Sequence, residues 1–509
     1  MAILNRGGYA IWTSTIVKTL GILEAMLAAC LAVPTFVALG LGEDPLPYFS
    51  VAIPLLTLGM CQYVLFKNAS EFRPANGLLL IGLCWFVLFA VGTVPYLLLG
   101  FSPMDALFES VSGFTTTGAT LIEDASAMPM ALMVWRSFTQ WVGGITVILL
   151  FMYLLPMVGI GRTVLLNELS GSGSSEYSLK LEKAALSFII VYALFTVVNY
   201  IIIVLLGVGP AEALCMTFAT ISTGGLLCTA DNLASYSIYV QAVTAVFMFL
   251  GGVNFYLHYN AIVNHQRGVY RGNSEFRFNV FWFVAVSGVM AVMLLLNSEG
   301  SFTEGWDGLA EGLWDSVFTV VSVGTSSGFT IADLSVFPAQ CLTILMVVAV
   351  IGASSGSTSG GVKISRLNVI YQFMKVTVSK TLHPNVVRDV RVDGQTLNHA
   401  AVLSAFSILM LFMATLIVGS VVIMMCGFDI QDAVGITIAM VGNLGTSFGD
   451  FGPNGSFADV SDLVKAIMMI LMWVGRLEVL TALVFLSPAF WKELWRVNRI
   501  KSRWKHRAS

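Results

Sequence analysis

Four segments of this chain place glycine, threonine and serine together between long apolar stretches, where main-chain oxygen atoms could act as ligands. They read DALFESVSGFTTTGAT from Asp105, AEALCMTFATISTGGL from Ala211, DSVFTVVSVGTSSGFT from Asp315 and DAVGITIAMVGNLGTS from Asp432. A glycine lies thirteen places after the first residue of each segment, at Gly118, Gly224, Gly328 and Gly445. Four matches at one offset predict an internal repeat.

The chemistry that such segments offer is coordination of a cation by carbonyl oxygens. Unpaired backbone is tolerated at membrane depth only where protein buries it or where it lines a water-filled cavity. A ring of carbonyl oxygens can replace the hydration shell of a potassium ion, and glycine allows the backbone angles required. We therefore predict that the following residues form a selectivity filter: Thr116, Thr117, Gly118, Ser222, Thr223, Gly224, Ser326, Ser327, Gly328, Asn443, Leu444 and Gly445.

The copies differ in detail. The second has Ala211 where the others begin with aspartate, although Glu212 is adjacent. The fourth has Asn443 and Leu444 where the others have a hydroxyl residue before the glycine, so its side-chain environment must differ. Gly449 is a second candidate for the filter glycine of the fourth copy, but the repeat offset favours Gly445. Small residues that only pack between helices are the alternative interpretation of any single copy.

Each segment begins as a short helix. In the first, Ser102, Pro103 and Asp105 suit the N-cap, N1 and N3 positions, and Asp429 with Asp432 repeats the spacing in the fourth. About eleven helical residues extend roughly 16 Å, half of a hydrocarbon core of about 30 Å. The chain must then return to the side it came from, so we predict re-entrant loops whose helices direct their negative C-terminal ends toward a cavity.

A second glycine-rich stretch, IGASSGSTSGGVKISR at 351–366, interrupts a long apolar run. Four glycines and several small polar residues make a continuous helix improbable there. A small-residue packing face is one alternative. GASSG also matches the G-x-S-x-G pattern around Ser354, but no strand is expected before it, and Val362 separates glycine from Lys363 and so breaks a Walker A motif.

Arg476 is the most informative charge, because it is predicted inside the last apolar helix. A central arginine costs about 2.5–3.5 kcal/mol on insertion scales, so it must face protein or water. Glu478 lies two positions along and would point to another side of the helix. An arginine satisfied by buried carbonyls for packing alone is the alternative. Arg136 and Lys465 are predicted near the outer ends of their helices, where they could extend to the interface.

The elements that must position these groups are membrane helices. The chain has 509 residues, 57% hydrophobic and 11% charged, with a mean hydropathy of +0.84, which excludes an ordinary soluble protein. A net charge of −3 gives no reason to expect nucleic-acid binding. Seven cysteines and five histidines show no metal-ligand spacing, so we predict no cofactor in this chain and interpret the cysteines as small core residues.

Ten apolar runs are long enough to span a membrane of ordinary thickness. They begin near Ile16, Leu46, Gly77, Met130, Ala184, Ile238, Phe278, Ala339, Ala400 and Leu463. Lysine and arginine gather in alternate connections, and aspartate and glutamate occupy the opposite ones. The positive-inside rule therefore predicts that both termini are cytoplasmic.

Three stretches carry a resemblance to a known family: TTTGAT at 115–120, GSTSGGVKISR at 356–366 and GRLEVLTALVFL at 475–486. Over nearly its whole length the chain resembles the TrkH membrane subunits of bacterial Trk potassium uptake systems, in the Trk/Ktr/HKT superfamily. The resemblance implies a potassium-selective pore in the bacterial cytoplasmic (inner) membrane, a homodimer, and control by a cytosolic nucleotide-binding subunit of the TrkA type. It also implies that the interrupted helix is an intramembrane gating loop below the filter, with Arg476 as an electrostatic barrier; the gating residues are then Gly352, Gly356, Ser357, Thr358, Gly360, Gly361, Lys363 and Arg476.

The predicted fold is an all-α polytopic membrane protein, with four pseudo-repeats of helix, re-entrant pore loop and helix around a central pore and two extra N-terminal transmembrane helices. The predicted divisions are an N-terminal two-helix region (1–72), pore repeats at 73–165, 180–268, 276–380 (with a broken second helix) and 396–490, and a basic cytoplasmic tail (491–509).

The predicted function is uptake of potassium, as a substrate rather than a cofactor, by a protein that is not an enzyme. A sodium- or proton-coupled secondary symporter is the main alternative, because broken helices at mid-depth also suit that class. A hydrolase built on Ser354 is a third and weaker hypothesis. The basic segments Lys375–Arg391 and Lys492–Arg507 could contact either anionic membrane lipid or the regulatory subunit.

Overall fold

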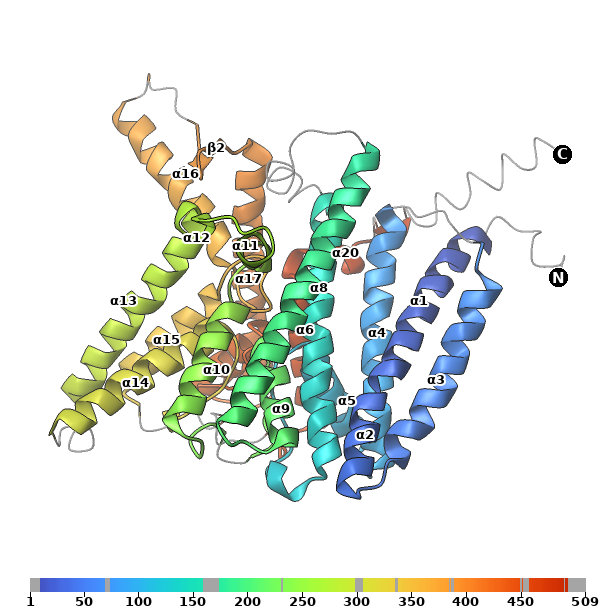
Figure 1. Ribbon diagram of the computed structural model, residues 1–509. Coiled ribbons are helices and arrows are strands. Elements are labelled where there is room, and N and C mark those ends of the chain that lie inside the picture. The colour runs from blue at the N-terminus through green and yellow to red at the C-terminus, as the bar shows by residue number, and fades with distance from the viewer. Residues whose placement is uncertain are drawn as a thin grey trace, which may run out of the picture. The chain divides into compact units, whose positions relative to one another are not determined.

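The computed structural model describes residues 10–68, 74–158, 174–229, 232–297, 305–334, 337–383, 385, 389–448, 451, 457–488 and 490–492. In this part of the chain six helices are long and apolar enough to cross a membrane, or up to eight spans if each of two bent helix pairs counts as one. A helical polytopic membrane protein, as predicted, is confirmed. Figure 1 shows the order of the helices along the chain.

The chain divides into two compact units, and the first comprises Met1–Ser110, Pro129–Trp135 and Leu477–Ser509. Its helices are α1 (Ala10–Cys30), α2 (Ala32–Leu41), α3 (Leu46–Leu65), α4 (Pro74–Leu98) and α20 (Val479–Leu486). Helices α1 and α3 approach closely where two glycines face each other: a Cβ atom added to Gly21 would lie 2.7 Å from the carbonyl oxygen of Gly59. Small residues allow such backbone contact between membrane helices.

The second unit comprises Val111–Met128 and Arg136–Arg476. Two helices, α5 (Pro103–Phe114) and α6 (Met130–Val158), begin in the first unit and end in the second, with the short turn η1 (Ala125–Ala127) between them. The helices that lie entirely in the second unit are α8 (Ser174–Leu205), α9 (Pro210–Ile221), α10 (Ile238–Gly251), α11 (Phe255–Ile262), α12 (Val269–Gly272), α13 (Ser274–Asn297), α14 (Gly305–Gly324), α15 (Ala339–Ile351), α16 (Ile364–Leu382), α17 (His399–Met425), α18 (Ile430–Val441) and α19 (Asp462–Arg476).

A small hairpin joins α16 to α17. Strand β1 (Arg391–Val392) pairs antiparallel with β2 (Gln395–Thr396) around Asp393 and Gly394, which both have positive φ angles, as a type I′ turn requires. The Asp393 carboxylate also accepts a hydrogen bond of 3.0 Å from the N–H of Ser274 at the start of α13. This bond joins the hairpin to the start of α13.

The division into two units does not test the predicted repeat boundaries, which stay predictions.

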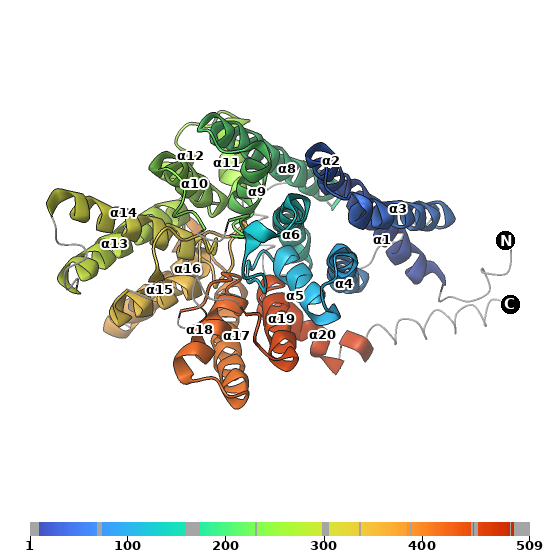
Figure 2. The same cartoon turned by 90° about the horizontal axis from the view of Figure 1, so that it is seen from below.

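Four helices lead into the glycine-rich segments: α5, α9, α14 and α18. Three of them have 12 residues, about 18 Å, close to the predicted length. The prediction is wrong for α14, which has 20 residues because it begins at Gly305, well before the repeat. Seen from below, in Figure 2, the loops that follow α9, α14 and α18 converge with the loop that follows α5.

Two of the short helices are capped as predicted. The Ser102 hydroxyl accepts a hydrogen bond of 3.2 Å from the Asp105 N–H and donates one to its carboxylate. The Asp429 carboxylate accepts a 2.9 Å bond from the N–H of Asp432. At α9 the N-cap residue is Gly209, which has no side chain to supply such a bond. Carboxylates in the first turn also interact favourably with the helix dipole.

Three breaks interrupt helices of the second unit or end them early. The predicted one is confirmed: α15 ends at Ile351 and α16 begins at Ile364. A second was not predicted: α10 ends at Gly251 and α11 begins at Phe255, with a bend of 102°. The third corrects the prediction that Arg476 lies inside a continuous helix. That helix, α19, ends at the arginine, and Glu478 has φ 59°, which an α-helix cannot accommodate.

Replacing Asp429 with Ala should lower the stability of the protein in detergent by about 1 kcal/mol, because the N–H groups that open α18 lose their acceptor. The measurement is the midpoint of thermal denaturation. Asp429→Asn is the matched control, since asparagine caps as well as aspartate and should leave the midpoint nearly unchanged. Equal losses in both variants would mean that the charge matters and the cap does not.

Candidate functional site

The four glycine-rich loops share one backbone conformation. The first residue of each has a left-handed conformation, with φ of 52°, 52°, 57° and 51° at Thr116, Thr223, Ser326 and Asn443. Two residues later comes a glycine with positive φ, of 83°, 81°, 73° and 80°, at Gly118, Gly225, Gly328 and Gly445. The residue between them donates its N–H to a carbonyl five residues earlier, as Thr117 does to Ser112 (2.9 Å) and Leu444 to Ala439 (2.8 Å).

This shared conformation corrects the alignment of the second copy by one residue. The equivalent of Gly118 is Gly225, not Gly224, and the second segment therefore begins at Glu212 rather than Ala211. Ser222 drops out of the predicted set of filter positions, because it matches the residue before the left-handed one. The glycine doublet hid the shift in the sequence. With the corrected register, all four segments begin with an acidic residue.

The positive-φ glycines are in contact with the neighbouring loops. A Cβ atom on Gly118 would overlap the carbonyl oxygen of Gly224, and one on Gly225 would overlap that of Ser327. In the same way a Cβ on Gly328 would overlap the carbonyl of Leu444, and one on Gly445 that of Thr117. Each loop thus packs its glycine against a carbonyl of the next, and the fourth packs against the first. The four loops form a closed cycle in chain order.

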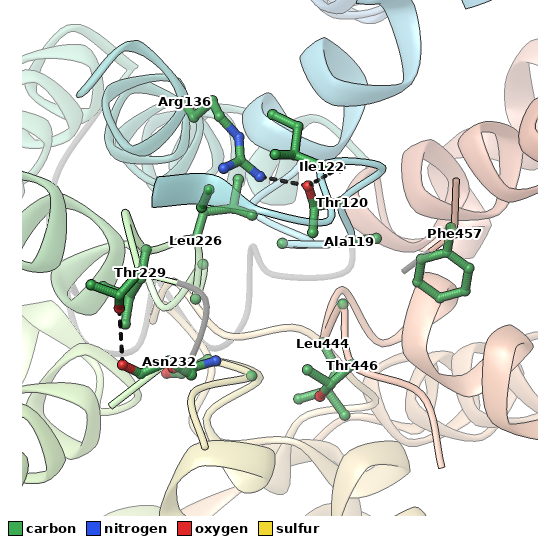
Figure 3. A pocket seen from close by; sticks show the side chains of 18 of the residues that line it. Ala119, Thr120, Ile122, Arg136, Leu226, Thr229, Asn232, Leu444, Thr446 and Phe457 are labelled. Atoms are coloured by element: carbon green, nitrogen blue, oxygen red, sulfur yellow. Dashed lines mark hydrogen bonds between the residues drawn. The ribbon is translucent and has the colours of Figure 1, made fainter. Parts of the chain in front are cut away.

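A cavity of about 380 Å³ opens at this cycle (Figure 3). All four positive-φ glycines line it, together with Ala119, Thr120, Leu226 and Thr446, which come from the segments that leave the loops, and Phe457 from the connection after the fourth loop. Of the filter residues predicted from sequence, Gly118, Gly224, Ser327, Gly328, Leu444 and Gly445 line this cavity. Gly449, the competing glycine of the fourth segment, lies outside the described residues.

Two acidic side chains line the cavity. Glu123 and Asp459 line it, from the connections that follow the first and fourth loops. In the first connection, hydrogen bonds from the Ser126 hydroxyl and N–H lower the pKa of Asp124 below its usual value, so this carboxylate keeps its charge at neutral pH. A concentration of negative charge at a mouth attracts cations.

One cation lines the same cavity. Arg136 is 2% exposed, and its Nη2 donates a 2.7 Å hydrogen bond to Thr120 Oγ1 (Figure 3). The prediction that Arg136 extends to the membrane interface is wrong, because this hydroxyl holds the guanidinium at the cavity wall. Lys465 is also buried, at 6% exposed, so the same prediction is wrong for it.

Gln140 was not predicted, and it supports the second loop. Its side chain is fully buried; Nε2 donates a 2.6 Å bond to the carbonyl of Gly224, and Oε1 accepts a 3.2 Å bond from the N–H of Leu226. A Cβ atom on Gly224 would lie 2.7 Å from this Nε2, which explains why the residue before Gly225 is also a glycine. An uncharged amide in the middle of an apolar helix was the available signal in the sequence.

The interrupted segment between α15 and α16 contacts three of the four loops. Thr358 Oγ1 lies 3.1 Å from Thr223 Oγ1 of the second loop, and the N–H of Gly360 donates a 3.1 Å bond to Ser326 Oγ of the third. Gly360 also packs so closely on the carbonyl of Gly442, at the start of the fourth loop, that a Cβ there would overlap it. The segment therefore lies against loop residues that precede the cavity-lining glycines.

This segment also pairs with the unpredicted break in the second repeat. The N–H of Ser354 donates to the carbonyl of Gly252 (3.0 Å), and the N–H of Phe255 donates to the carbonyl of Gly356 (3.2 Å). Each broken helix thus satisfies backbone groups of the other. Ser354 follows a helix rather than a strand, so the hydrolase elbow considered from its sequence pattern has no structural support.

The other predicted gating residues shape the segment itself. Gly352 and Gly361 have φ of 70° and 78° and pack on each other, since a Cβ on Gly361 would lie 2.9 Å from Gly352 Cα. Ser357 Oγ donates a 2.6 Å bond to the carbonyl of Ser354. Lys363 ends the segment with φ 79°, and its Nζ donates to the carbonyl of Ser359.

Arg476 is 4% exposed and contacts the interrupted segment directly. Its Nη1 donates a 2.8 Å hydrogen bond to the carbonyl of Thr358. Its Nε and Nη2 atoms are buried and have no hydrogen-bond partner among the residues that the structure describes. One turn earlier, the carbonyl of Met472 accepts a 3.0 Å bond from Asn443 Nδ2, which also donates to Thr117 Oγ1. The arginine therefore stands beside the interrupted segment and one turn from a contact with the fourth loop.

The fold and the site define a polytopic membrane protein in which four loops converge on a single cavity. An interrupted helix contacts these loops, and Arg476 contacts the interrupted helix. Residues 55–493 match the model of the TrkH family, described as cation transport protein, and the chain belongs to that family.

Solved and curated relatives extend over nearly the whole chain. The potassium uptake protein TrkH of the Trk system from Vibrio parahaemolyticus is 29% identical, over 94% of this chain and 99% of its own. That from Halomonas elongata is 31% identical, with the same coverage. The crystal structure of the potassium transporter TrkH from Vibrio parahaemolyticus superimposes with a TM-score of 0.84 at 27% identity, over 94% of this chain and 99% of that one.

Replacing Gln140 with Leu should loosen the second loop, because the Gly224 carbonyl and the Leu226 N–H would be left without their buried partner, a loss of about 1–3 kcal/mol. Hydrogen–deuterium exchange of the peptide that contains Leu226 should accelerate. Gln241→Leu is the matched control, since Gln241 bonds the carbonyls of Leu233 and Tyr236 instead. Unchanged exchange at Leu226 in Gln140→Leu would refute the supporting role.

Proposed function

We propose that this chain takes up potassium ions across the bacterial cytoplasmic (inner) membrane through a filter of main-chain oxygens. The observation that carries the proposal is the closed cycle in which the glycine of each loop packs against a carbonyl of the next. The names of the relatives, potassium uptake proteins of the Trk system, support the choice of ion. The proposed filter consists of Thr116–Gly118, Thr223–Gly225, Ser326–Gly328 and Asn443–Gly445.

A filter of this kind works by exchanging oxygen ligands. An entering ion loses water and gains carbonyl oxygens that the packed loops hold at a fixed spacing. The acidic entrance raises the local cation concentration. The short helices end at the loops, so the partial negative charge of their C-terminal ends favours a cation just beyond the filter. Acidic side chains inside the filter are then unnecessary, which agrees with its composition.

Gating is assigned to the interrupted segment and to Arg476. The segment would obstruct the path on the far side of the loops, where its bonds to Thr223 and Ser326 hold it in place. A guanidinium charge about 5 Å from a passing monovalent cation, at an effective dielectric constant of about 20, opposes it by roughly 3 kcal/mol. Opening would require both to move away from the path.

The assembly is also part of the proposal. We expect a homodimer, with a cytosolic nucleotide-binding subunit of the TrkA type acting on the gate and with potassium as substrate. Exposed basic residues of α16 and the hairpin, among them Lys375 and Arg391, offer a surface for that subunit or for anionic lipid. Cytoplasmic termini remain the expectation from the distribution of charge.

A sodium- or proton-coupled symporter is the second candidate, favoured by one observation. Two helix breaks, at Gly251–Phe255 and Ile351–Ile364, pair with each other, and paired discontinuous helices are typical of secondary transporters. The two candidates differ in what drives flux. Potassium current through voltage-clamped proteoliposomes without a sodium or pH gradient would exclude obligatory coupling, whereas current that appears only with such a gradient would establish it.

The chain should restore growth at low potassium to bacteria that lack potassium uptake, and Gly118→Ala should not, with rubidium uptake reduced at least about tenfold. Both the φ of 83° and the overlap with the Gly224 carbonyl oppose a methyl group at this glycine. Gly207→Ala is the matched control: its φ is 92°, but nothing lies within 4 Å of the added atom. Absence of uptake by correctly inserted wild-type protein would contradict the proposed function.

Replacing Arg476 with Met should raise potassium flux about tenfold or more, because the opposing charge is removed while the volume is roughly kept. Arg476→Lys keeps the charge and should stay close to the wild-type rate. The measurement is rubidium uptake into proteoliposomes at equal protein density. Similar flux in both variants would show that the charge is not the barrier.

A further inference from the structure

Two of the cysteines that appear scattered in the sequence meet behind the second loop. Cys215 lies in the middle of α9, and Cys228 lies three residues after Gly225, in the segment that leaves the loop. They are 0% and 6% exposed, and the two thiols interact with each other. Neither is in a disulfide. The structure therefore holds a pair of neighbouring thiols next to the proposed filter.

Because the four loops share one conformation, the equivalent pairs in the other copies indicate how close these two positions lie in the fold. The equivalent residues are Phe108 and Leu121 in the first copy, Phe318 and Ile331 in the third, and Gly435 and Phe448 in the fourth. A Cβ added to Gly435 would lie 3.2 Å from the nitrogen of Phe448, so the two Cα atoms of that pair are at most about 6 Å apart. Disulfides join Cα atoms about 4.4–6.8 Å apart.

We propose that Cys215 and Cys228 form an oxidation-sensitive dithiol that closes to a disulfide between α9 and the segment leaving the second loop. In the reaction the two S–H bonds break and one Sγ–Sγ bond forms. The dithiol loses two electrons and two protons to a peroxide, whose O–O bond breaks: with hydrogen peroxide the products are the disulfide and two water molecules. A dithiol such as dithiothreitol reverses the step by exchange.

The cavity offers a route for a small oxidant. Leu227 and Thr229, on either side of Cys228, both line it, and so does Arg136, whose charge acts on Cys215. A cavity of about 380 Å³ has room for several molecules of the size of water or peroxide. The cavity belongs to the side whose connections are acidic, which the charge pattern predicts to face outward, where disulfides persist.

Closing the bond would fix the second loop at both of its ends. The helix that enters the loop would be joined covalently to the segment that leaves it, only three residues beyond Gly225. Adjustment of the Gly224 and Gly225 carbonyls to a passing ion would then be restricted. The effect on transport rests on the proposed function, whereas formation of the bond does not.

The first test counts thiols in the full-length protein in detergent. After exposure to hydrogen peroxide and alkylation, peptide mass spectrometry should find a peptide pair linked through Cys215 and Cys228, and dithiothreitol should remove it. Cys341→Ser is the matched control, because it removes another buried cysteine and should leave the linked pair unchanged. Two free thiols at 215 and 228 after oxidation of folded protein would overturn the proposal. Retention of both thiols together with one bound mercuric ion per chain would also overturn it, in favour of a soft-metal site.

The second test measures rubidium uptake by the same preparations in proteoliposomes. Peroxide should slow uptake by the wild type severalfold, dithiothreitol should restore it, and Cys215→Ser and Cys228→Ser should not respond to peroxide. If the linked peptide forms and uptake is unaffected, the control of transport is refuted while the dithiol stands. If reduced wild-type protein carries no rubidium at all, the proposed function fails and the thiol count still decides the chemistry.

Discussion

Main-chain oxygens at membrane depth need partners, and the second unit is arranged to satisfy that need without covering the oxygens that face the cavity. Each loop leaves the helical hydrogen-bond pattern for only a few residues, and at that point its glycine packs against a carbonyl of the next loop. Because glycine has no side chain, backbone meets backbone, and Cα–H groups contact carbonyl oxygens. The four loops therefore support one another, and a change at any one of these glycines displaces the carbonyl of its neighbour.

The backbone of this cycle is repeated, but the side chains around it are not. In the left-handed position of the loops, Thr223 and Ser326 contact the interrupted segment, whereas Asn443 donates to Thr117 and to Met472 of α19. Gln140 supports the second loop alone. A single chain can assign a different task to each copy, which a symmetric tetramer cannot do. The second and third loops contact the interrupted segment, the second is also supported by Gln140, and the fourth contacts both the first loop and the helix that carries Arg476.

Sequence reasoning succeeded where a local rule determines the backbone. The caps at Ser102 and Asp429 and the break after Ile351 follow from side-chain oxygens, glycines and prolines that act over a few residues. It failed where a contact distant in sequence decides. Nothing near Gly224 and Gly225 reveals which of the two takes the positive φ, because Gln140 and Ser327 decide it. Arg136 was assigned to the interface because its partner Thr120 lies on another element, and Cys215 and Cys228 appeared unrelated for the same reason.

The hydrogen bonds between the interrupted segment and the loops have a consequence for the proposed open state. In the proposed gating, withdrawal of the segment would break the bonds that join it to Thr223 and Ser326 and the bond from Arg476 to the Thr358 carbonyl, inside a low-dielectric region. Water would replace those partners, so opening would hydrate this level of the protein. The equilibrium between the proposed shut and conducting forms would then also be an equilibrium of hydration: solutes too large to enter would draw water out and favour the shut form, coupling the protein to the osmotic state of its surroundings.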